Sequence, residues 1–324
     1  MTKLLFVGDL HYSGVNPENY ISDYKEDFKT QMQEVYELAR KHEVEAILTP
    51  GDIFNSHTVS NSTLLELAEI LQESHVKWYT IIGNHDIVGY NTDSYSRSSL
   101  RLLSMLTDKI KVITNDLGHG STDDVVITGT NYSNLMDVEG YGYSNNFTNG
   151  TFSVFNIHLS HGMLLDHVPP FERYTLIKDV QTTANLVLCG HDHTGFGVVT
   201  RSDGKMFCNP GAFMRQKASE NELNRTVQVA LITVGFENTV ELIHLQSAKP
   251  GHEVLSRKAL EEAKQRDYAM SEFAALIQLK TGELVSLDTL QVVQEIGKSE
   301  CVPQEVISEA VRLIQGRRGS SVIR

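Results

Sequence analysis

The chain has 324 residues, and its 41 acidic and 28 basic side chains give a formal net charge of −13. Hydrophobic residues make up 40% of the sequence, enough for one large domain or two smaller ones, which excludes a disordered chain and a small disulfide scaffold. No apolar run approaches the roughly 20 residues that cross a bilayer. The three cysteines stand at wide spacings, which favours a reducing compartment and predicts a cytoplasmic protein.

The acidic balance restricts how the chain would bind a polyanion. A protein that binds DNA unaided gathers phosphate affinity from a broad basic surface, and this sequence has no basic surplus. Bound metal ions, a partner subunit or a local basic patch would have to supply the positive charge. Candidates for such a patch, each with a solvated charged face as the alternative, are Arg97, Arg101, Arg215 and Lys217.

The first 200 residues alternate short apolar runs with segments of helical period, which predicts an α/β domain. Strands are predicted over 4–7, 46–49, 78–82, 111–113, 125–128, 152–159 and 186–189. Helices are predicted over 27–42 and 63–74, where apolar residues share one face. Residues 131–150, rich in Asn, Tyr and Gly, predict a polar surface loop or lid. Base stacking is the alternative role for its aromatic residues, Tyr132, Tyr141, Tyr143 and Phe147.

The character of the sequence changes twice after this region. Residues 197–246 read as short strands that complete the domain as an antiparallel sheet. After Pro250-Gly251 the pattern predicts helices over 259–280, 287–296 and 303–314. We therefore expect a domain over 1–250 and a helical region over 251–324. The apolar faces of these short helices need burial on the first domain, on each other or on a partner.

Five apolar strands end at polar residues that can bind metal. The strand ends are Asp9-Leu10-His11, Gly51-Asp52, Gly83-Asn84-His85-Asp86, the strand with His158 and His161, and Gly190-His191-Asp192-His193. Side chains at the carboxyl ends of neighbouring strands converge on one crevice. A glycine at such a junction lets the backbone turn sharply and pass close to a ligand. The sequence therefore aims a set of metal ligands at one place.

The types of these residues indicate the metal chemistry. Imidazole, carboxylate and one amide oxygen without thiolate suit Mn²⁺, Fe or Zn²⁺ better than a calcium cage. Seven ligands with one shared carboxylate would fill two sites. Two metal ions about 3.5 to 4 Å apart can hold the attacking and leaving oxygens of a displacement at phosphorus.

In this order and at these separations, the motifs resemble those of the calcineurin-like metallophosphoesterases over roughly the first 200 residues. The resemblance implies a β-sandwich flanked by helices (αββα) and two divalent ions, with Mn²⁺ preferred and Fe, Zn²⁺ or Mg²⁺ as alternatives. It assigns one ion to Asp9, His11, Asp52 and His193, and the other to Asp52, Asn84, His191 and the strand-end histidine. His161 is preferred to His158 there, because Gly162 follows it. By the same resemblance, His85 faces the scissile phosphate and Asp86 orients His85.

Further features resemble one branch, the SbcD-type DNA repair nucleases, including compact phage-encoded members. These features are Gly51-Asp52-Ile53-Phe54, Leu100-Arg101-Leu102-Leu103, and Asn209-Pro210-Gly211-Ala212 with Arg215. The resemblance implies a phosphodiesterase that cuts DNA in repair, recombination or DNA degradation. Its implied partners are DNA, an SMC-like ATPase subunit that docks on the C-terminal helices, and a second copy of the chain. The alternatives are an enzyme for a small phosphoester or cyclic nucleotide, and a non-catalytic binding subunit.

Overall fold

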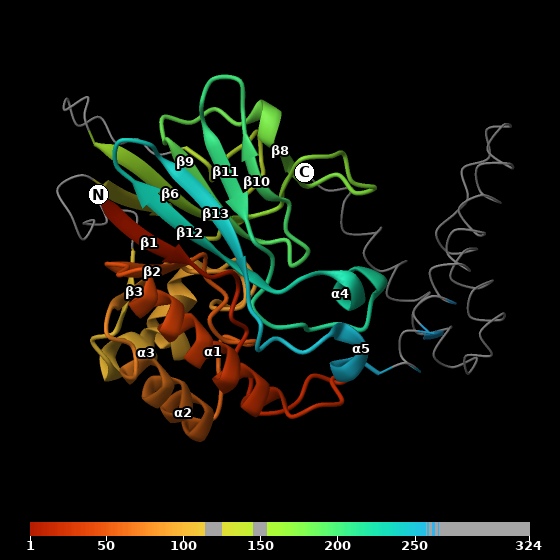
Figure 1. Ribbon diagram of the computed structural model, residues 1–324. Helices are drawn as coiled ribbons and strands as arrows, with labels where there is room; N and C mark the ends of the chain where they lie inside the picture. The colour runs from red at the N-terminus through yellow and green to blue at the C-terminus, as the bar shows by residue number, and fades with distance from the viewer. Residues whose placement is uncertain (114–124, 145–153, 257, 259–260, 263–264, 266–324) are drawn as a thin grey trace, which may run out of the picture. The chain divides into compact units, whose positions relative to one another are not determined.

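Two β-sheets pack face to face in the first part of the chain in the computed structural model (Figure 1). The structure describes residues 1–113, 125–144, 154–256, 258, 261, 262 and 265. The chain divides into two compact units, Met1–Lys264 and Gln265–Arg324. Phe147 and nearly all of the three helices predicted after residue 258 lie outside the described residues.

The first sheet contains the parallel βα units that the alternating pattern predicted. Its six strands run in the order β13-β12-β1-β2-β3-β4. The parallel strands are β1 (Thr2–Phe6), β2 (Ala46–Thr49), β3 (Lys77–Thr80) and β4 (Ile110–Val112). The helices between them are α1 (Tyr24–Lys41), α2 (Asn61–Gln72) and α3 (Ser99–Leu106), with the 3-10 turn η1 (Thr92–Arg97) before α3. Antiparallel strands β12 (Gln228–Val234) and β13 (Thr239–His244) complete the sheet beside β1.

The second sheet has five strands in the order β10-β11-β9-β6-β5. These are β5 (Val125–Thr130), β6 (Phe155–Gly162), β9 (Leu186–His191), β10 (Gly197–Thr200) and β11 (Met206–Asn209). The single antiparallel sheet expected over 197–246 is wrong, since β11 pairs parallel to β9 while β12 and β13 join the first sheet. The smaller elements are β7 (Leu164–Leu165), β8 (Thr175–Leu176), η2 (Ile177–Asp179), α4 (Glu220–Asn224) and α5 (Gly251–Val254).

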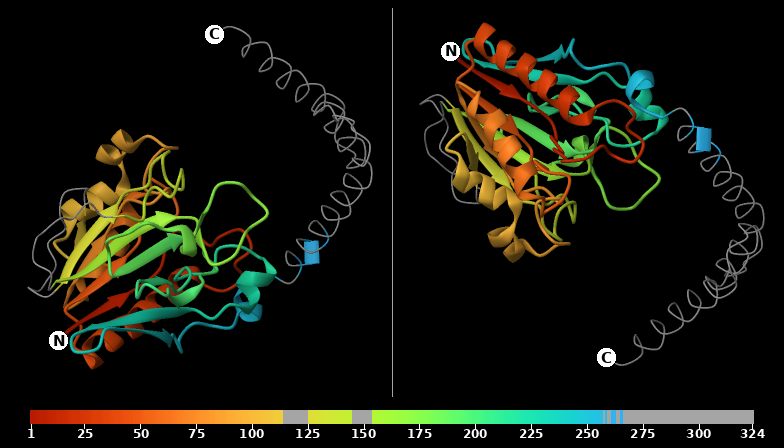
Figure 2. Two further views of the ribbon diagram at one scale, coloured as in Figure 1. Left: turned by 90° about the horizontal axis from the view of Figure 1, so that it is seen from above. Right: turned by 90° about the horizontal axis from the view of Figure 1, so that it is seen from below.

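Alternating side chains of the strands build separate core layers. Leu4 and Phe6 of β1 face the second sheet, whereas Leu5 packs against the helices. All four residues of β2 are buried, as expected for a parallel strand covered on both faces. Each buried leucine or phenylalanine contributes about 1.5 to 3 kcal/mol. Helices α1 to α3 cover the outer face of the first sheet, which confirms the predicted α/β sandwich (Figure 2).

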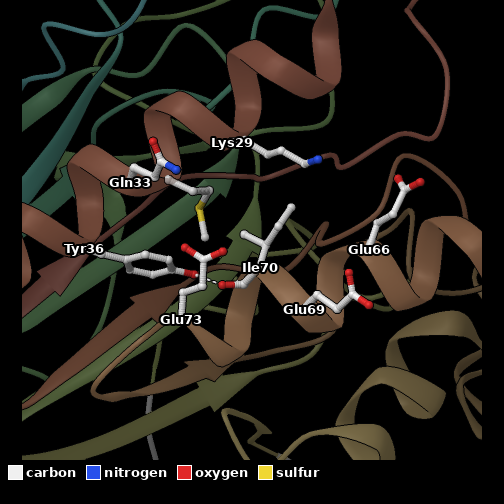
Figure 3. A pocket seen from close by; sticks show the side chains of 8 residues that line it. Lys29, Gln33, Tyr36, Glu66, Glu69, Ile70 and Glu73 are labelled. Carbon is white, nitrogen blue, oxygen red and sulfur yellow. Dashed lines mark hydrogen bonds between the residues drawn. The ribbon is translucent and has the colours of Figure 1, made fainter.

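The outer helices are fixed by caps and by one another. Asp23 caps α1 by accepting hydrogen bonds from the amides of Lys25 and Glu26. Tyr36 of α1 donates a hydrogen bond of 2.8 Å to the carbonyl of Ile70 in α2, below a pocket of about 160 Å³ (Figure 3). The strand-end residues do not line this pocket.

The loop after β5 differs from the polar surface loop that its composition predicted. Met136 and Tyr143 are buried against Val187 and Phe207 on the outer face of the second sheet. The Tyr143 hydroxyl donates a hydrogen bond to Asp137. The described part of the loop is therefore a covering layer, because a few apolar anchors outweigh the surrounding Asn and Gly residues.

Candidate metal centre

The predicted strand-end residues meet where β1, β2, β3, β6 and β9 end. One group of ligand atoms comes from Asp9, His11 and His193, which lie within 4.8 Å of one another. His11 Nε2 is 2.9 Å from His193 Nε2, and His193 Nε2 is 3.7 Å from Asp9 Oδ2. The loops after β1 and β9 thus bring together residues that are far apart in the sequence.

A second group surrounds the side-chain oxygen of Asn84. This Oδ1 atom is 2.8 Å from His161 Nε2 and 2.9 Å from His191 Nδ1. Asp52 lies between the two groups, since its Oδ2 is 3.6 Å from His11 Nε2 and 3.3 Å from His161 Nε2. One carboxylate oxygen therefore faces both sets of imidazoles.

The two histidines of β6 have different surroundings. His161 continues the row of residues that faces the first sheet, and its Nδ1 lies 2.9 Å from the carbonyl of Pro50. His158 points to the opposite face, where its ring nitrogens contact Thr128 Oγ1 at 2.8 Å and the carbonyl of Gly142 at 3.1 Å. Residues three apart in a strand face opposite ways, which explains the separation. Only His161 reaches the predicted centre.

The backbone of the centre is strained at three of its residues. His11, Asp52 and His191 have positive φ angles of 49°, 50° and 79°, in the left-handed region that side chains disfavour. The amide of His11 donates to the carbonyl of Asp52, and the amide of His191 donates to Asp9 Oδ2 at 2.8 Å. A Cβ on Gly190 would overlap Asp9, so glycine is required at this junction. Strain of this kind concentrates at functional sites.

The imidazoles and the first carboxylate have unusual pKa values because they are buried. Burial lowers the pKa of His11 to about 3, that of His191 to about 3 and that of His193 to about 2. Burial, together with repulsion by Asp52, raises the pKa of Asp9 to about 6 despite the opposing attraction of His161. These three imidazoles are therefore neutral and can offer lone pairs to a cation. The raised pKa of Asp9 shows that the residues around it do not fully stabilise its negative charge.

Asp52 and His161 form a buried pair, with 3.3 Å between Asp52 Oδ2 and His161 Nε2. Burial is the largest influence on the pKa of Asp52 and acts to raise it, but attraction by and hydrogen bonding to His161, together with attraction by His11 and His85, hold that pKa well below its ordinary value. Burial acts to lower the pKa of His161, but the attraction of Asp52 raises it to about 9. Asp9 Oδ1 is buried with no hydrogen-bond partner among the described residues. Neutral imidazoles, carboxylates and an unpartnered buried oxygen fit divalent metal ions.

His85 forms a further group with His11 and Asp52, whose ligand atoms lie within 4.8 Å of one another, whereas Asp86 contacts backbone amides. The His85 amide donates to Asp52 Oδ1 at 2.8 Å, and its ring Nδ1 lies 2.8 Å from the carbonyl of Asn55. Asp86 Oδ2 accepts from the amides of Gly83 and Asp52 at 2.8 and 2.9 Å. The expected orientation of His85 by Asp86 is thus not what the contacts show. Asp86 joins the turns after β2 and β3, while the Asn55 carbonyl orients the imidazole.

An open pocket of about 340 Å³ lies over the centre. Among the residues that line it are His85, Asn84 and the exposed Lys217. Arg215 is wrong as a phosphate-binding candidate, since it is 7% exposed and donates to the carbonyls of Glu222, Arg225 and Lys249. Arg97 and Arg101 are exposed on η1 and α3 and are not part of this pocket's lining.

Sequence reasoning did not find the backbone contacts that orient two imidazoles. The carbonyls of Pro50 and Asn55 perform this task, and a carbonyl leaves no signature in the residue type. Tyr132, whose ring lies 5.9 Å from that of His161, was noticed only as one of several aromatic residues in the loop. Its neighbour Asn131 accepts from the amide of Ile82, and no motif around Asn131 pointed to the centre.

The fold and the centre define a metal-dependent phosphoesterase, a hydrolase of phosphoester bonds. The chain belongs to the calcineurin-like phosphoesterase family, because that family's model matches residues 2–195, more than half of its length. No curated protein gives a match. Within the described ranges, no helix has the length and apolar character that a membrane span requires.

Two solved structures are similar in fold at low identity. A dimetal phosphatase from Danio rerio is 13% identical, with a TM-score of 0.46, over 75% of this chain and 96% of that chain. GAP50, the anchor in the inner membrane complex of Plasmodium, is 14% identical, with a TM-score of 0.45, over 76% of this chain and 86% of that chain.

Proposed function

We propose that the protein is a two-metal phosphodiesterase that hydrolyses DNA, as an SbcD-like nuclease in repair, recombination or DNA degradation. The position of Asp52 carries the two-metal part of the proposal. Its Oδ2 atom lies within 3.6 Å of an imidazole from each ligand group, as a carboxylate shared by two ions requires. The proposed ligands are Asp9, His11, Asp52 and His193 for one ion, and Asp52, Asn84, His161 and His191 for the other.

The protein's own side chains prepare this chemistry. When bound, divalent ions activate a water and neutralise charge on the phosphate oxygens. His161 donates from Nδ1 to Pro50, which leaves Nε2 directed to the centre. His85 donates from Nδ1 to Asn55, which leaves Nε2 for the leaving oxygen of the substrate. His85 in its imidazolium form carries a second proton on Nε2, and its donation to the leaving oxygen, which leaves a neutral imidazole, is worth about 10² to 10⁴ in rate.

The substrate part of the proposal is supported by the open pocket and by the SbcD-like motifs. Lys217, which is exposed and lines the pocket, would contact a phosphate beside the scissile one. With a net charge of −13, the chain would gain most from a partner that supplies cationic surface. We therefore also propose an SMC-like ATPase subunit as partner, a homodimer as the assembly and a bacterial cytoplasm as the location.

A second candidate is a phosphodiesterase for a small phosphoester or cyclic nucleotide. The pocket volume of about 340 Å³ favours it, since small-ligand pockets begin at about 300 Å³. An assembly-only metal site is less well supported, because His85 lines the pocket and its Nε2 atom has no hydrogen bond within the part of the chain that the structure describes.

One experiment separates these functions. Purified protein with Mn²⁺ is incubated with end-labelled linear DNA, circular DNA, a cyclic nucleotide and a chromogenic phosphodiester. Digestion of linear DNA supports the nuclease, and circular DNA then distinguishes exonuclease from endonuclease activity. Turnover of the cyclic nucleotide without DNA digestion would favour the second candidate. Failure to hydrolyse any of them would favour the non-catalytic subunit.

A further inference from the structure

Two tyrosines form an aromatic surface beside the metal centre. The ring of Tyr132 lies with its centroid 5.9 Å from that of His161 and 5.8 Å from that of His191. Tyr90 stacks on Tyr132, with centroids 5.9 Å apart and ring planes within 20°. Tyr90 is 55% exposed. This tyrosine pair, Tyr90 and Tyr132, therefore extends from the ligand histidines to solvent.

The inner tyrosine is held in place by the backbone of the centre itself. The amide of Tyr132 donates to the carbonyl of Ile82 at 2.9 Å, and the amide of Ile82 donates to Asn131 Oδ1 at 2.9 Å. Ile82 lies two residues before Asn84, on the same strand end. Because these two bonds fix the ring relative to the centre, little ordering would be needed when a ligand stacks there.

A fixed positive charge lies over the outer tyrosine. The guanidinium carbon of Arg173 is 5.5 Å from the centroid of the Tyr90 ring. Arg173 Nε and Nη2 donate to the carbonyl of Met136, and Nη2 also donates to that of Asn134. Carbonyl partners orient the guanidinium without neutralising it. An aromatic face with a neighbouring cation matches a planar base attached to a phosphate.

We propose that the tyrosine pair binds the nucleobase of the nucleotide whose phosphate occupies the metal centre. This inference deepens the proposed phosphodiesterase function and rests on it. Phosphate binding would be provided by the centre, while the base packs against the exposed Tyr90 side chain together with the Arg173 guanidinium that lies over its ring. Stacking tolerates every base, so the surface would select nucleotides over other phosphoesters without selecting a sequence.

The test uses phosphodiesters that differ only in the base. Thymidine 5′-(4-nitrophenyl phosphate) is compared with its base-free 1,2-dideoxyribose analogue, and the 3′ isomers are compared in the same way. The wild-type protein should prefer one thymidine diester by about 10-fold in kcat/KM, mainly through KM. Tyr90→Leu should abolish this preference by lowering kcat/KM for the thymidine diester to the value for its base-free analogue. Tyr90→Phe should retain it, because the ring remains.

Tyr141→Leu is the matched control, since Tyr141 is 44% exposed on the loop that carries Tyr132. It should keep the wild-type preference. A turnover-independent measurement is the Kd of thymidine 5′-monophosphate against 2-deoxyribose 5-phosphate by calorimetry with Mn²⁺. The nucleotide should bind about 10-fold more tightly to the wild type and no more tightly to Tyr90→Leu.

The inference and the proposed function fail in different ways. Equal binding and hydrolysis of base-bearing and base-free compounds by the wild type would overturn the inference, even if DNA is digested. An unchanged preference in Tyr90→Leu would overturn it as well. A preference that depends on Tyr90 without digestion of DNA would support the base site and refute the nuclease.

Discussion

Replacement of Asp52 with asparagine tests the centre most directly. Asparagine keeps the shape of the side chain and an oxygen that can accept from the amide of His85, so the local backbone is preserved. What is lost is the negative charge 3.3 to 3.6 Å from imidazoles of both ligand groups. The substitution should therefore weaken both metal sites, whereas His11→Ala should weaken mainly one.

The size of the effect follows from linkage. Each site filled at 100 times its Kd stabilises the fold by about 2.7 kcal/mol, so two filled sites give about 5 kcal/mol. A domain of this size gains roughly 2 to 4 °C in Tm for each kcal/mol, which predicts a Mn²⁺-dependent rise of about 10 to 20 °C. If Asp52→Asn weakens each site about 100-fold, the same Mn²⁺ concentration leaves a rise of only about 2 to 3 °C.

The assay is thermal unfolding with and without Mn²⁺, together with metal analysis of the purified protein. Asp192→Asn is the control, because it makes the same chemical change between His191 and His193. The Asp192 carboxylate accepts from the amides of Thr194 and Gly195 at 3.2 Å. The control should keep most of the Mn²⁺-dependent rise. Two retained ions and a wild-type rise in Asp52→Asn would show that Asp52 does not bridge two metals.

Three further outcomes are expected. His85→Ala should lose about 10² to 10⁴ in kcat with both ions retained, and loss of metal from this variant would make His85 a ligand. Burial lowers the pKa of His158 to about 4, so between pH 6.5 and pH 4 the unfolded chain takes up a proton at this residue that the folded chain does not, and the free energy of unfolding decreases as the pH is lowered. In denaturation of chelator-treated protein over this pH range, His158→Gln should lose up to about 3 kcal/mol less unfolding free energy than the wild type. The same pH dependence in both proteins would contradict this prediction. Arg215→Met should lower the unfolding free energy by about 3 kcal/mol, because it leaves buried carbonyls unpaired. Lys217→Ala should instead raise KM and change the unfolding free energy by no more than about 0.5 kcal/mol. A raised KM without destabilisation in Arg215→Met would reverse these two assignments.

The hydrophobic pattern along the sequence was sufficient to predict the parallel strands and helices of the first sheet. Strand β2 and helix α1 were predicted within a few residues, because an unbroken apolar run and a one-sided apolar helix face each reflect burial directly. The two strand pairs after residue 197 were recognised as strands but placed in one sheet. Pairing partners far apart in the chain decide that assignment, and the pairing of β11 with β9 leaves no local signal.

The same distinction applies to the centre. The strand-end motifs identify side chains that meet, since each follows an apolar strand whose direction is known. His161 was chosen over His158 from the glycine that follows it, and strand alternation gives an independent reason for the same choice. Arg215 was misjudged because a charged residue near a motif resembles a ligand contact. Its burial against three carbonyls is visible only in three dimensions.

The strained backbone helps to explain how the candidate ligands come to face one another. Left-handed conformations at His11, Asp52 and His191 cost roughly 1 to 2 kcal/mol each. They persist because the amides of His11 and His191 are bonded within the centre and because Asp86 holds the amide of Asp52. These bonds involve backbone atoms and carboxylates of neighbouring strand ends, so the surrounding fold supports the strain and directs the three side chains to one place.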